Sequence, residues 1–330
     1  MRTATLIAFA ITLTAPAIAP ARASSFFLQP QVREPRITVF HDISRQAFPE
    51  CITVGPDGNL WATEELNPHE GGAVVRIDLR GRRTGTFHYG PTYYQGRDIV
   101  TGADGALWIA DGYDNQLVRM TTDGKFRLIP APSGPIAVTP GPDGNIWFAG
   151  LYLSPPTVGK VTPSGQITTY SSGIATGLQD ITEGPDGALW FTEYGAAVGR
   201  ITTDGVVTEY RMGIPHGAHP TAITAGPDGN LWFTEPDNSA IARITPAGFV
   251  TQFTQGITGD PTYLATGRSE ALWFTEHEAE KIGRITINGL VTEYSKGISP
   301  LAMPGCIIRG PDGNMWFTEV ENYSIGRVKL

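Results

Sequence analysis

The sequence predicts an all-β fold, a seven-bladed β-propeller of four-stranded blades. Three observations support this prediction: one tryptophan-centred phrase occurs seven times, short β-rich runs alternate with turn residues, and no long helical pattern is present. The 330 residues include 40 Gly and 26 Pro, so turn formers are abundant. Such a composition is typical of all-β domains built from many short strands.

The repeat is defined by the tryptophans, which lie 39 to 47 residues apart. They are Trp61, Trp108, Trp147, Trp190, Trp232, Trp273 and Trp316. This period is typical of propellers and solenoids. In the fifth repeat, strands are expected at residues 221–224, 230–235, 241–245 and 249–253, which makes one blade. The Gly-Pro-Asp-Gly turn before the second strand is explained by turn chemistry, because Pro presets φ and Gly accepts positive φ.

The two ends of the propeller are expected to meet in one blade. The last repeat has three strands and then ends at Leu330, so its outer strand is missing. Residues 36–40 precede the first full repeat and alternate like the outer strands at 206–210 and 290–294. We therefore predict that this N-terminal strand completes the seventh blade and removes exposed sheet edges.

The N-terminal residues 1–23 have the pattern of a signal peptide. Arg2 is followed by an apolar stretch at 6–19 and by Ala21-Arg22-Ala23, a small-residue cleavage motif. A membrane anchor is the alternative, but the stretch is short and contains Pro16. The predicted organisation is a signal peptide at 1–23, an N-terminal segment at 24–35 and a single propeller domain at 36–330. We expect an exported protein, periplasmic or secreted, that is monomeric and has no transmembrane segment in the mature chain.

Charge and motifs exclude several function classes. The net charge is -8 and Lys and Arg are not clustered, so nucleic acid is not an expected partner. The sequence has no G-x-S-x-G elbow, no H-E-x-x-H and no Walker loop, so hydrolases of those types are not supported. The expected partner is a small-molecule or peptide-like ligand.

In a propeller, the residues before each inner strand surround the mouth of the central channel. We predict a ligand-binding ring there, made by Glu50, Arg97, Gln179, Thr221, Thr262 and Tyr263, with Asp98, Asp180 and Gly305 beside them. The alternative is a solvated channel mouth without a ligand.

Acids and bases repeat together along the chain. Six of the seven blades have an acid three residues after the Trp, with Gly150 as the exception, and every blade has a base in its third strand. We expect these acids and bases to form ion pairs within or between blades. Surplus acids such as Glu278 and Glu280 are candidates for a hard divalent cation, which prefers carboxylate oxygens.

Histidines supply the candidate catalytic groups. His216 and His219 precede the inner strand of blade five, and His277 follows Glu276 in blade six. Histidine beside carboxylate is the usual composition of a general base or a metal site. The predicted catalytic residues are therefore His219, His277 and Glu276, with ordinary surface histidines as the alternative.

The only two cysteines occupy the same position in two repeats. Cys51 and Cys306 each precede the hydrophobic Ile of an inner strand, one in blade one and the other in blade seven. These blades become neighbours when the ring closes. A disulfide across the closure is one hypothesis, and two buried free thiols are the other.

The repeated phrase Gly-Pro-Asp-Gly-Asn-Leu-Trp-Phe-Thr-Glu, followed by Ile-Gly-Arg-Ile-Thr and Val-Thr-Glu-Tyr, resembles the streptogramin B lyase (virginiamycin B lyase) family. The resemblance covers residues 36–330. It implies an enzyme that opens a cyclic depsipeptide antibiotic by elimination and uses Mg²⁺ as cofactor. The predicted metal ligands are Glu278, Glu319 and Glu321, of which Glu319 or Glu321 corresponds to the acid after the Trp strand of blade seven in that family.

The sequence departs from the family pattern at the channel mouth. The family has a Pro-His pair before the inner strand of blade six and Glu-Pro-His before that of blade seven. Here, Thr262 and Gly305 replace the two histidines, and Met303 replaces the first acid. An elimination needs a base for the α-proton, which neither Thr262 nor Gly305 supplies. The expectation is a lyase-like propeller in which this ring-opening chemistry is weak or absent; the alternatives are a lyase with histidines at new positions and a non-catalytic ligand-binding or protein-interaction propeller.

Overall fold

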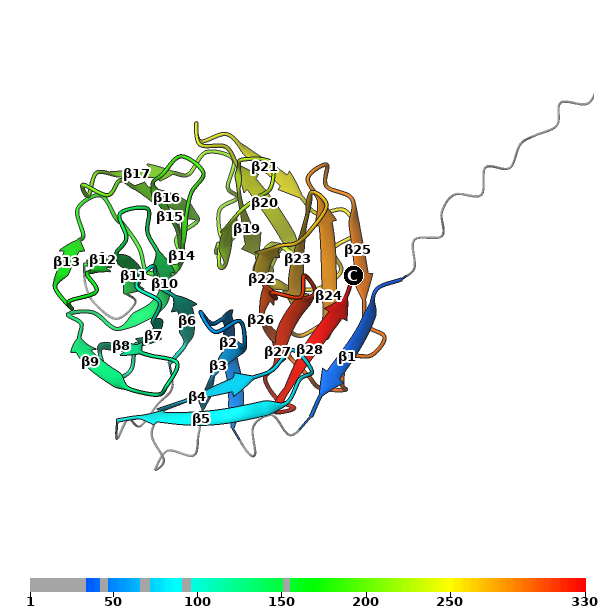
Figure 1. The fold of residues 1–330 in the computed structure, drawn as a ribbon. Helices are drawn as coiled ribbons and strands as arrows, with labels where there is room; N and C mark the ends of the chain where they lie inside the picture. The colour runs from blue at the N-terminus through cyan, green and yellow to red at the C-terminus, as the bar shows by residue number, and fades with distance from the viewer. Residues whose placement is uncertain (1–33, 42–46, 66–71, 91–95, 151–154) are drawn as a thin grey trace, which may run out of the picture. The chain divides into compact units, whose positions relative to one another are not determined.

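Each tryptophan repeat forms a four-stranded antiparallel sheet, and the seven sheets surround a common axis like blades (Figure 1). The computed structural model describes residues 34–41, 47–65, 72–90, 96–150 and 155–330. Residues Pro35–Leu330 form one compact unit. The prediction of a seven-bladed propeller is confirmed.

The strands occur in the same order in every blade. The inner strands are β2 (Phe48–Val54), β6 (Asp98–Thr101), β10 (Pro135–Pro140), β14 (Leu178–Glu183), β18 (Ile223–Ala225), β22 (Pro261–Thr266) and β26 (Pro304–Arg309). The second strands, which carry the tryptophans, are β3 (Leu60–Glu65), β7 (Leu107–Asp111), β11 (Ile146–Gly150), β15 (Leu189–Glu193), β19 (Leu231–Glu235), β23 (Ala271–Glu276) and β27 (Met315–Glu319).

The third and outer strands complete the blades. The third strands are β4 (Gly72–Ile77), β8 (Gln116–Met120), β12 (Thr157–Val161), β16 (Ala197–Ile201), β20 (Ala240–Ile244), β24 (Lys281–Thr286) and β28 (Ser324–Lys329). The outer strands are β5 (Arg83–Tyr89), β9 (Phe126–Pro130), β13 (Ile167–Tyr170), β17 (Val207–Tyr210), β21 (Val250–Phe253), β25 (Val291–Tyr294) and β1 (Arg36–Phe40). A short 3₁₀ helix, η1 (Pro236–Asn238), follows β19. No helix in the described part of the chain is long and apolar enough to cross a membrane.

The N-terminal strand β1 is the outer strand of the last blade, as the sequence predicts. It pairs antiparallel with β28, and the register runs from Arg36 opposite Lys329 to Phe40 opposite Ile325. The sheet order β1-β28-β27-β26 therefore joins the two ends of the chain in one blade, which is visible beside the C-terminus in Figure 1.

The tryptophans form the core between blades, and the turn before each second strand holds them in place. In blade five, Trp232 is fully buried and its Nε1 donates a 3.0 Å hydrogen bond to Oδ1 of Asp228. A Cβ added to Gly226 would lie 2.4 Å from the Trp232 ring, so only glycine fits at the start of this turn. The same Trp–Asp bond occurs in blades one, two, three, four and seven.

The expected ring of ion pairs between the acids after the Trp strands and the third-strand bases is wrong. In five blades, the third-strand base pairs instead with the turn aspartate; Arg119 and Arg200 do so at 2.7 and 2.6 Å. In blade five, the Arg243 guanidinium also lies 5.5 Å from the Trp232 ring centre and 5.6 Å from that of Phe253. The third-strand bases therefore stabilise the turn that holds the tryptophan, and the acids after the Trp strands have other partners.

Candidate functional site

The channel-mouth residues lie at register shifts in the inner strands. Pairing between inner and second strands shifts register in blades one, three, four, six and seven. The residues inside these shifts are Glu50, Cys51, Ile136, Gln179, Asp180, Thr262, Tyr263, Gly305 and Cys306. A β-bulge turns side chains out of the regular alternation and is frequent beside functional sites. The bulges thus aim neighbouring side chains toward the axis.

The threonine two residues after the Trp supports these irregular strands. In blade four, Oγ1 of Thr192 accepts a 3.1 Å hydrogen bond from Asp180 N and donates one of 2.6 Å to Thr221 O in the next blade. In blade five, Thr234 forms the equivalent bonds with Ala222 N and Thr262 O. One buried hydroxyl therefore satisfies an inner-strand N–H and joins two blades.

A cavity of about 340 Å³ lies at this end of the inner strands. It is lined by Cys51, Arg97, Asp98, Ile136, Ala137, Gln179, Asp180, Thr221, Ala222, Thr262, Tyr263, Leu264, Cys306 and Ile307. Five of the six predicted ligand-binding residues are in this lining. Glu50, the sixth, is not, although it precedes Cys51. The volume falls within the range of small-molecule sites, roughly 300–1,000 Å³.

Two carboxylates on one side of the cavity also connect neighbouring blades. Asp98 accepts hydrogen bonds of 2.8 Å from Ile99 N and from Val138 N of the next blade. Asp180 accepts equivalent bonds of 2.8 Å from Ile181 N and from Ile223 N. Burial raises the pKa of Asp98 to about 6, and burial together with the charge of Asp98 raises that of Asp180 to about 7. The cavity therefore contains two carboxylates that interact electrostatically.

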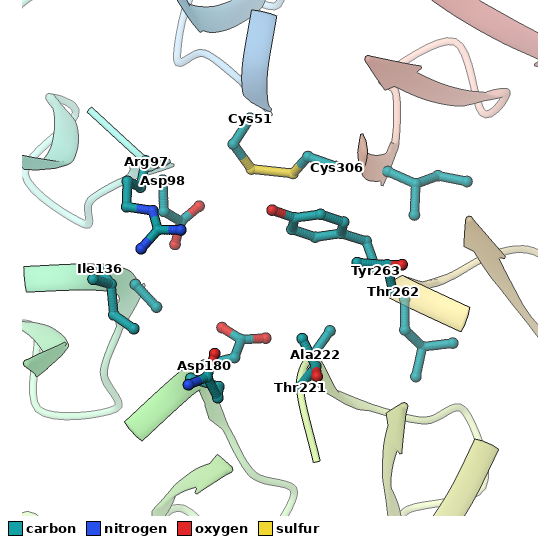
Figure 2. A pocket seen from close by; sticks show the side chains of 14 residues that line it. Cys51, Arg97, Asp98, Ile136, Asp180, Thr221, Ala222, Thr262, Tyr263 and Cys306 are labelled. Carbon is teal, nitrogen blue, oxygen red and sulfur yellow. A yellow bond between two sulfur atoms is a disulfide. The ribbon is translucent and has the colours of Figure 1, made fainter. Parts of the chain in front are cut away.

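The remaining polar groups of the cavity are a cation and a phenol. Figure 2 shows Arg97 next to Asp98. Tyr263 lies on the opposite side of the cavity, and its hydroxyl points into the cavity. Burial and the charges of Glu50, Asp98 and Asp180 raise the pKa of Tyr263 far above its ordinary value, although Arg97 lowers it. Tyr263 is therefore a neutral hydroxyl donor at physiological pH.

The acids after the Trp strands are buried, and loop groups partner them. Glu193 accepts hydrogen bonds from Ala175 N, Thr176 N and Thr176 Oγ1 at 3.0–3.2 Å. Burial and the nearby carboxylate of Glu209 raise the pKa of Glu193 to about 7. The predicted catalytic Glu276 is equally buried, accepts a 2.8 Å bond from Gly259 N and has a pKa raised to about 7 by burial and by Glu293. Glu276 does not line the cavity.

The predicted catalytic histidines have separate neighbours. His219 Nδ1 contacts Oδ2 of Asp237, and the His219 ring stacks on Tyr194 with centres 4.0 Å apart. His277 Nδ1 lies 3.3 Å from the carbonyl oxygen of Pro304. Neither histidine lines the cavity, and His216 is exposed. The structure does not bring His219, His277 and Glu276 together around that cavity.

The predicted metal ligands are not grouped either. Glu319 is buried and bonds to N and Oγ of Ser299 at 3.1 and 2.7 Å, and burial raises its pKa. Glu278 and Glu321 are exposed. Among the residues that the structure describes, no three His, Cys, Asp or Glu side chains form a cluster suited to a metal ion. Glu278, Glu319 and Glu321 therefore do not fit a Mg²⁺ site.

Cys51 and Cys306 form a disulfide with a Cα–Cα distance of 4.9 Å. The bond joins blade one to blade seven, and both cysteines line the cavity (Figure 2). The disulfide therefore forms part of the cavity wall as well as a covalent link across the closure.

Sequence reasoning missed the apolar part of the lining. Ile136, Ala137, Ala222, Leu264 and Ile307 contribute it. The signal was present in blade three, where Ile136 occupies the repeat position of Glu50, Arg97, Gln179, Thr221 and Thr262 in other blades. The cavity thus combines a charged side with an apolar side.

Comparisons with known proteins agree with the fold. The family model described as "Virginiamycin B lyase family" matches residues 35–254 and 213–330. No match was found in the search of curated proteins. At 11% identity and a TM-score of 0.69, the β-propeller domain of Cps50 (Swd1) from Myceliophteria thermophila shares the fold alone.

Three similar solved structures are lyases. Selenomethionine-substituted virginiamycin B lyase from Staphylococcus aureus is 32% identical with a TM-score of 0.81, covering 90% of this chain and 100% of that one. A catalytically inactive histidine-to-alanine variant of that lyase with quinupristin is 32% identical, with a TM-score of 0.80 and the same coverage. A streptogramin B lyase is 31% identical with a TM-score of 0.79, covering 90% of this chain and 98% of that one. With all seven repeats matched by the family model, this chain belongs to the virginiamycin B lyase family.

Proposed function

We propose that this protein is a ligand-binding member of its family that holds a small molecule in the channel-mouth cavity and does not open streptogramins. The observation that supports it most directly is the cavity itself, where Arg97, Asp180 and Tyr263 face one space of about 340 Å³. Polar groups converging on a partly apolar cavity are typical of small-molecule sites.

The case against ring opening rests on blades six and seven. The family resemblance places catalytic histidines at the positions of Thr262 and Gly305, and the S. aureus relative is inactive when one of its histidines is replaced by alanine. In this chain, a Cβ added to Gly305 would lie 2.6 Å from Thr318 Oγ1 and 3.0 Å from Val320 Cγ2. The side chains of Thr318 and Val320 therefore crowd the position that a histidine Cβ would occupy here.

The reaction test uses quinupristin with the S. aureus lyase as positive control. Elimination leaves the mass unchanged, so the opened product is followed by chromatography. We expect no product above the rate without enzyme. Turnover comparable to that of the control lyase would contradict the proposal; His219→Ala and His277→Ala variants would then show whether catalysis depends on these histidines.

The binding test uses thermal shifts with four probes of different charge: putrescine, succinate, L-leucyl-L-alanine and glucose. We expect at least one probe to raise the melting temperature through mass action. A Thr221→Trp variant, which fills the cavity from its rim, should remove the shift. No shift with any probe, or a shift unchanged in Thr221→Trp, would argue against the cavity as the site.

We also propose export, with residues 1–23 removed as a signal peptide. These residues lie outside the described part of the chain. The disulfide supports the proposal, because such bonds persist in oxidising compartments outside the cytosol. N-terminal sequencing of protein from cell fractions should find Ser24 as the first residue of an extracytoplasmic form; a cytosolic chain that retains Met1 would contradict it.

A further inference from the structure

The charges around the cavity specify the ligand more closely. Arg97 is exposed toward the cavity and forms no ion pair with any residue that the structure describes. This differs from the bases in the third strands, such as Arg119 and Arg243, which are engaged by turn aspartates. A guanidinium presents a planar fork of donors suited to a carboxylate. Arg97 is therefore available for an anionic group.

The carboxylates of Asp98 and Asp180 offer the opposite charge. Each oxygen of these two groups accepts one backbone N–H, and a carboxylate oxygen has capacity for a second bond. The charge of Asp98 raises the pKa of Asp180, so the two carboxylates repel each other when both are ionised. A cation placed beside both would relieve that repulsion.

The rest of the lining favours a ligand with an apolar part. Ile136, Leu264 and Ile307 line the cavity together with the Cys51–Cys306 disulfide. The hydroxyl of Tyr263 points inward and forms no hydrogen bond with a described residue, so it is available as an oriented donor. An amine, a carboxylate and a small apolar group would together satisfy this lining.

We propose that the cavity binds a small zwitterion of the amino-acid or dipeptide type, with its carboxylate on Arg97, its ammonium on Asp98 and Asp180, and its apolar side chain against Ile136 and Leu264. The inference rests on the proposed ligand-binding function and narrows it to one chemical class. Purely cationic or purely anionic molecules would leave either Arg97 or the two carboxylates without a partner of opposite charge.

The test compares L-leucyl-L-alanine with two analogues that each lack one charge, the N-acetyl dipeptide and the dipeptide amide. Binding is measured by calorimetry on the full mature chain. We expect the free dipeptide to bind about ten- to hundredfold more tightly than either analogue, the range for losing one charge-assisted hydrogen-bonded pair. If the amide binds as tightly as the free dipeptide, the assignment of the carboxylate to Arg97 is wrong. If the N-acetyl form does so, the assignment of the ammonium to Asp98 and Asp180 is wrong.

Variants connect each end of the probe to one side of the cavity. Arg97→Gln should weaken the free dipeptide about tenfold or more and leave the amide unaffected, because the amide lacks the carboxylate. Asp180→Asn removes the charge and keeps one acceptor oxygen, for either Ile181 N or Ile223 N; it should weaken the free dipeptide and leave the N-acetyl form unaffected. Melting curves identify variants that fail to fold, and Asp98→Asn is then the second variant for the ammonium side.

The outcome separates this inference from the proposed function. If the dipeptide does not bind while putrescine or succinate gives a shift that Thr221→Trp removes, the zwitterion is wrong and the cavity remains a binding site. If no probe binds, both fail. Dipeptide binding that is unchanged in Arg97→Gln and Asp180→Asn would also overturn the inference.

Discussion

Asp228 bonds to Trp232 and Arg243 at the same time: its Oδ1 accepts a 3.0 Å hydrogen bond from Trp232 Nε1, and its Oδ2 lies 3.2 Å from Arg243 Nη1. The pKa of Asp228 is lowered by these bonds and those from Asn230, in spite of burial that raises it. The carboxylate is therefore charged when it fixes the core tryptophan. The aspartate that repeats through the sequence is a packing element.

Replacing Asp228 by Ala should lower the free energy of unfolding by about 1–3 kcal/mol, because the indole N–H of a buried tryptophan loses its acceptor. Urea denaturation at pH 7 measures the change. Asp204→Ala is the matched control, since Asp204 is an exposed turn aspartate, and it should change stability by less than about 0.5 kcal/mol. Equal effects of the two substitutions would refute the packing role.

Removing residues 24–43 deletes β1 and leaves β28 without its outer neighbour. We expect loss of cooperative thermal unfolding or aggregation, because the exposed edge of the last blade is a template for pairing. A chain that starts at Glu34 keeps β1 and should melt like the mature protein. The role of β1 in closure is refuted if the longer deletion melts at the same temperature as that control.

The Cys51–Cys306 bond predicts that denatured, unreduced mature protein contains no titratable thiol and migrates as a monomer on a non-reducing gel. A Cys51→Ser, Cys306→Ser double variant should be less stable by about 2–5 kcal/mol, since the bond closes a long loop in the unfolded chain. Two free thiols per chain would show that the bond is absent.

Stability should depend on pH through Glu193 and Glu276. Both pKa values are raised from 4.5 to about 7, so the folded state holds these protons more tightly than the unfolded state. Their contribution is complete below about pH 4.5 and is lost as the pH rises through 7. A Glu193→Gln, Glu276→Gln variant has no proton to lose at these positions. The melting temperature of the variant minus that of the parent should therefore increase from pH 5 to pH 8.

Glu183→Gln is the control for this pH dependence because Glu183 is exposed. Its melting temperature should follow that of the parent protein across the same range. If the double variant also runs parallel to the parent from pH 5 to 8, the two buried carboxyls do not titrate as described.

The repeated phrase made the fold predictable because every blade repeats the tryptophan and strand pattern, and all blades except blade six have the Gly-x-Asp-Gly turn. The closure by residues 36–40 followed from the missing outer strand of the last repeat. The channel-mouth residues were located by their position in the repeat, and Arg97, Gln179, Thr221, Thr262 and Tyr263 do line one cavity.

What the sequence did not reveal depends on which groups meet in the folded chain. Arg200 is bonded to Asp186 and not to an acid after a Trp strand, a choice of partner set by which end of the blade each side chain occupies. Glu276 looked like a general base beside His277, but a loop amide from Gly259 covers it. Register shifts in the inner strands also cannot be predicted from the β-propensity of single residues, because they arise from how two strands pair.

The pairing of β1 with β28 also sets an order of events during synthesis. Among the strands that the structure describes, β1 is synthesised first and its partner β28 last, so β1 has no edge to join until β28 exists. Domains begin to fold from the N-terminal end as they are made, and six blades therefore have their own strands before the seventh is complete. A chain that ends before β28 would leave β1 and β27 each with an unpaired edge, so incomplete chains differ from finished molecules in one structural feature.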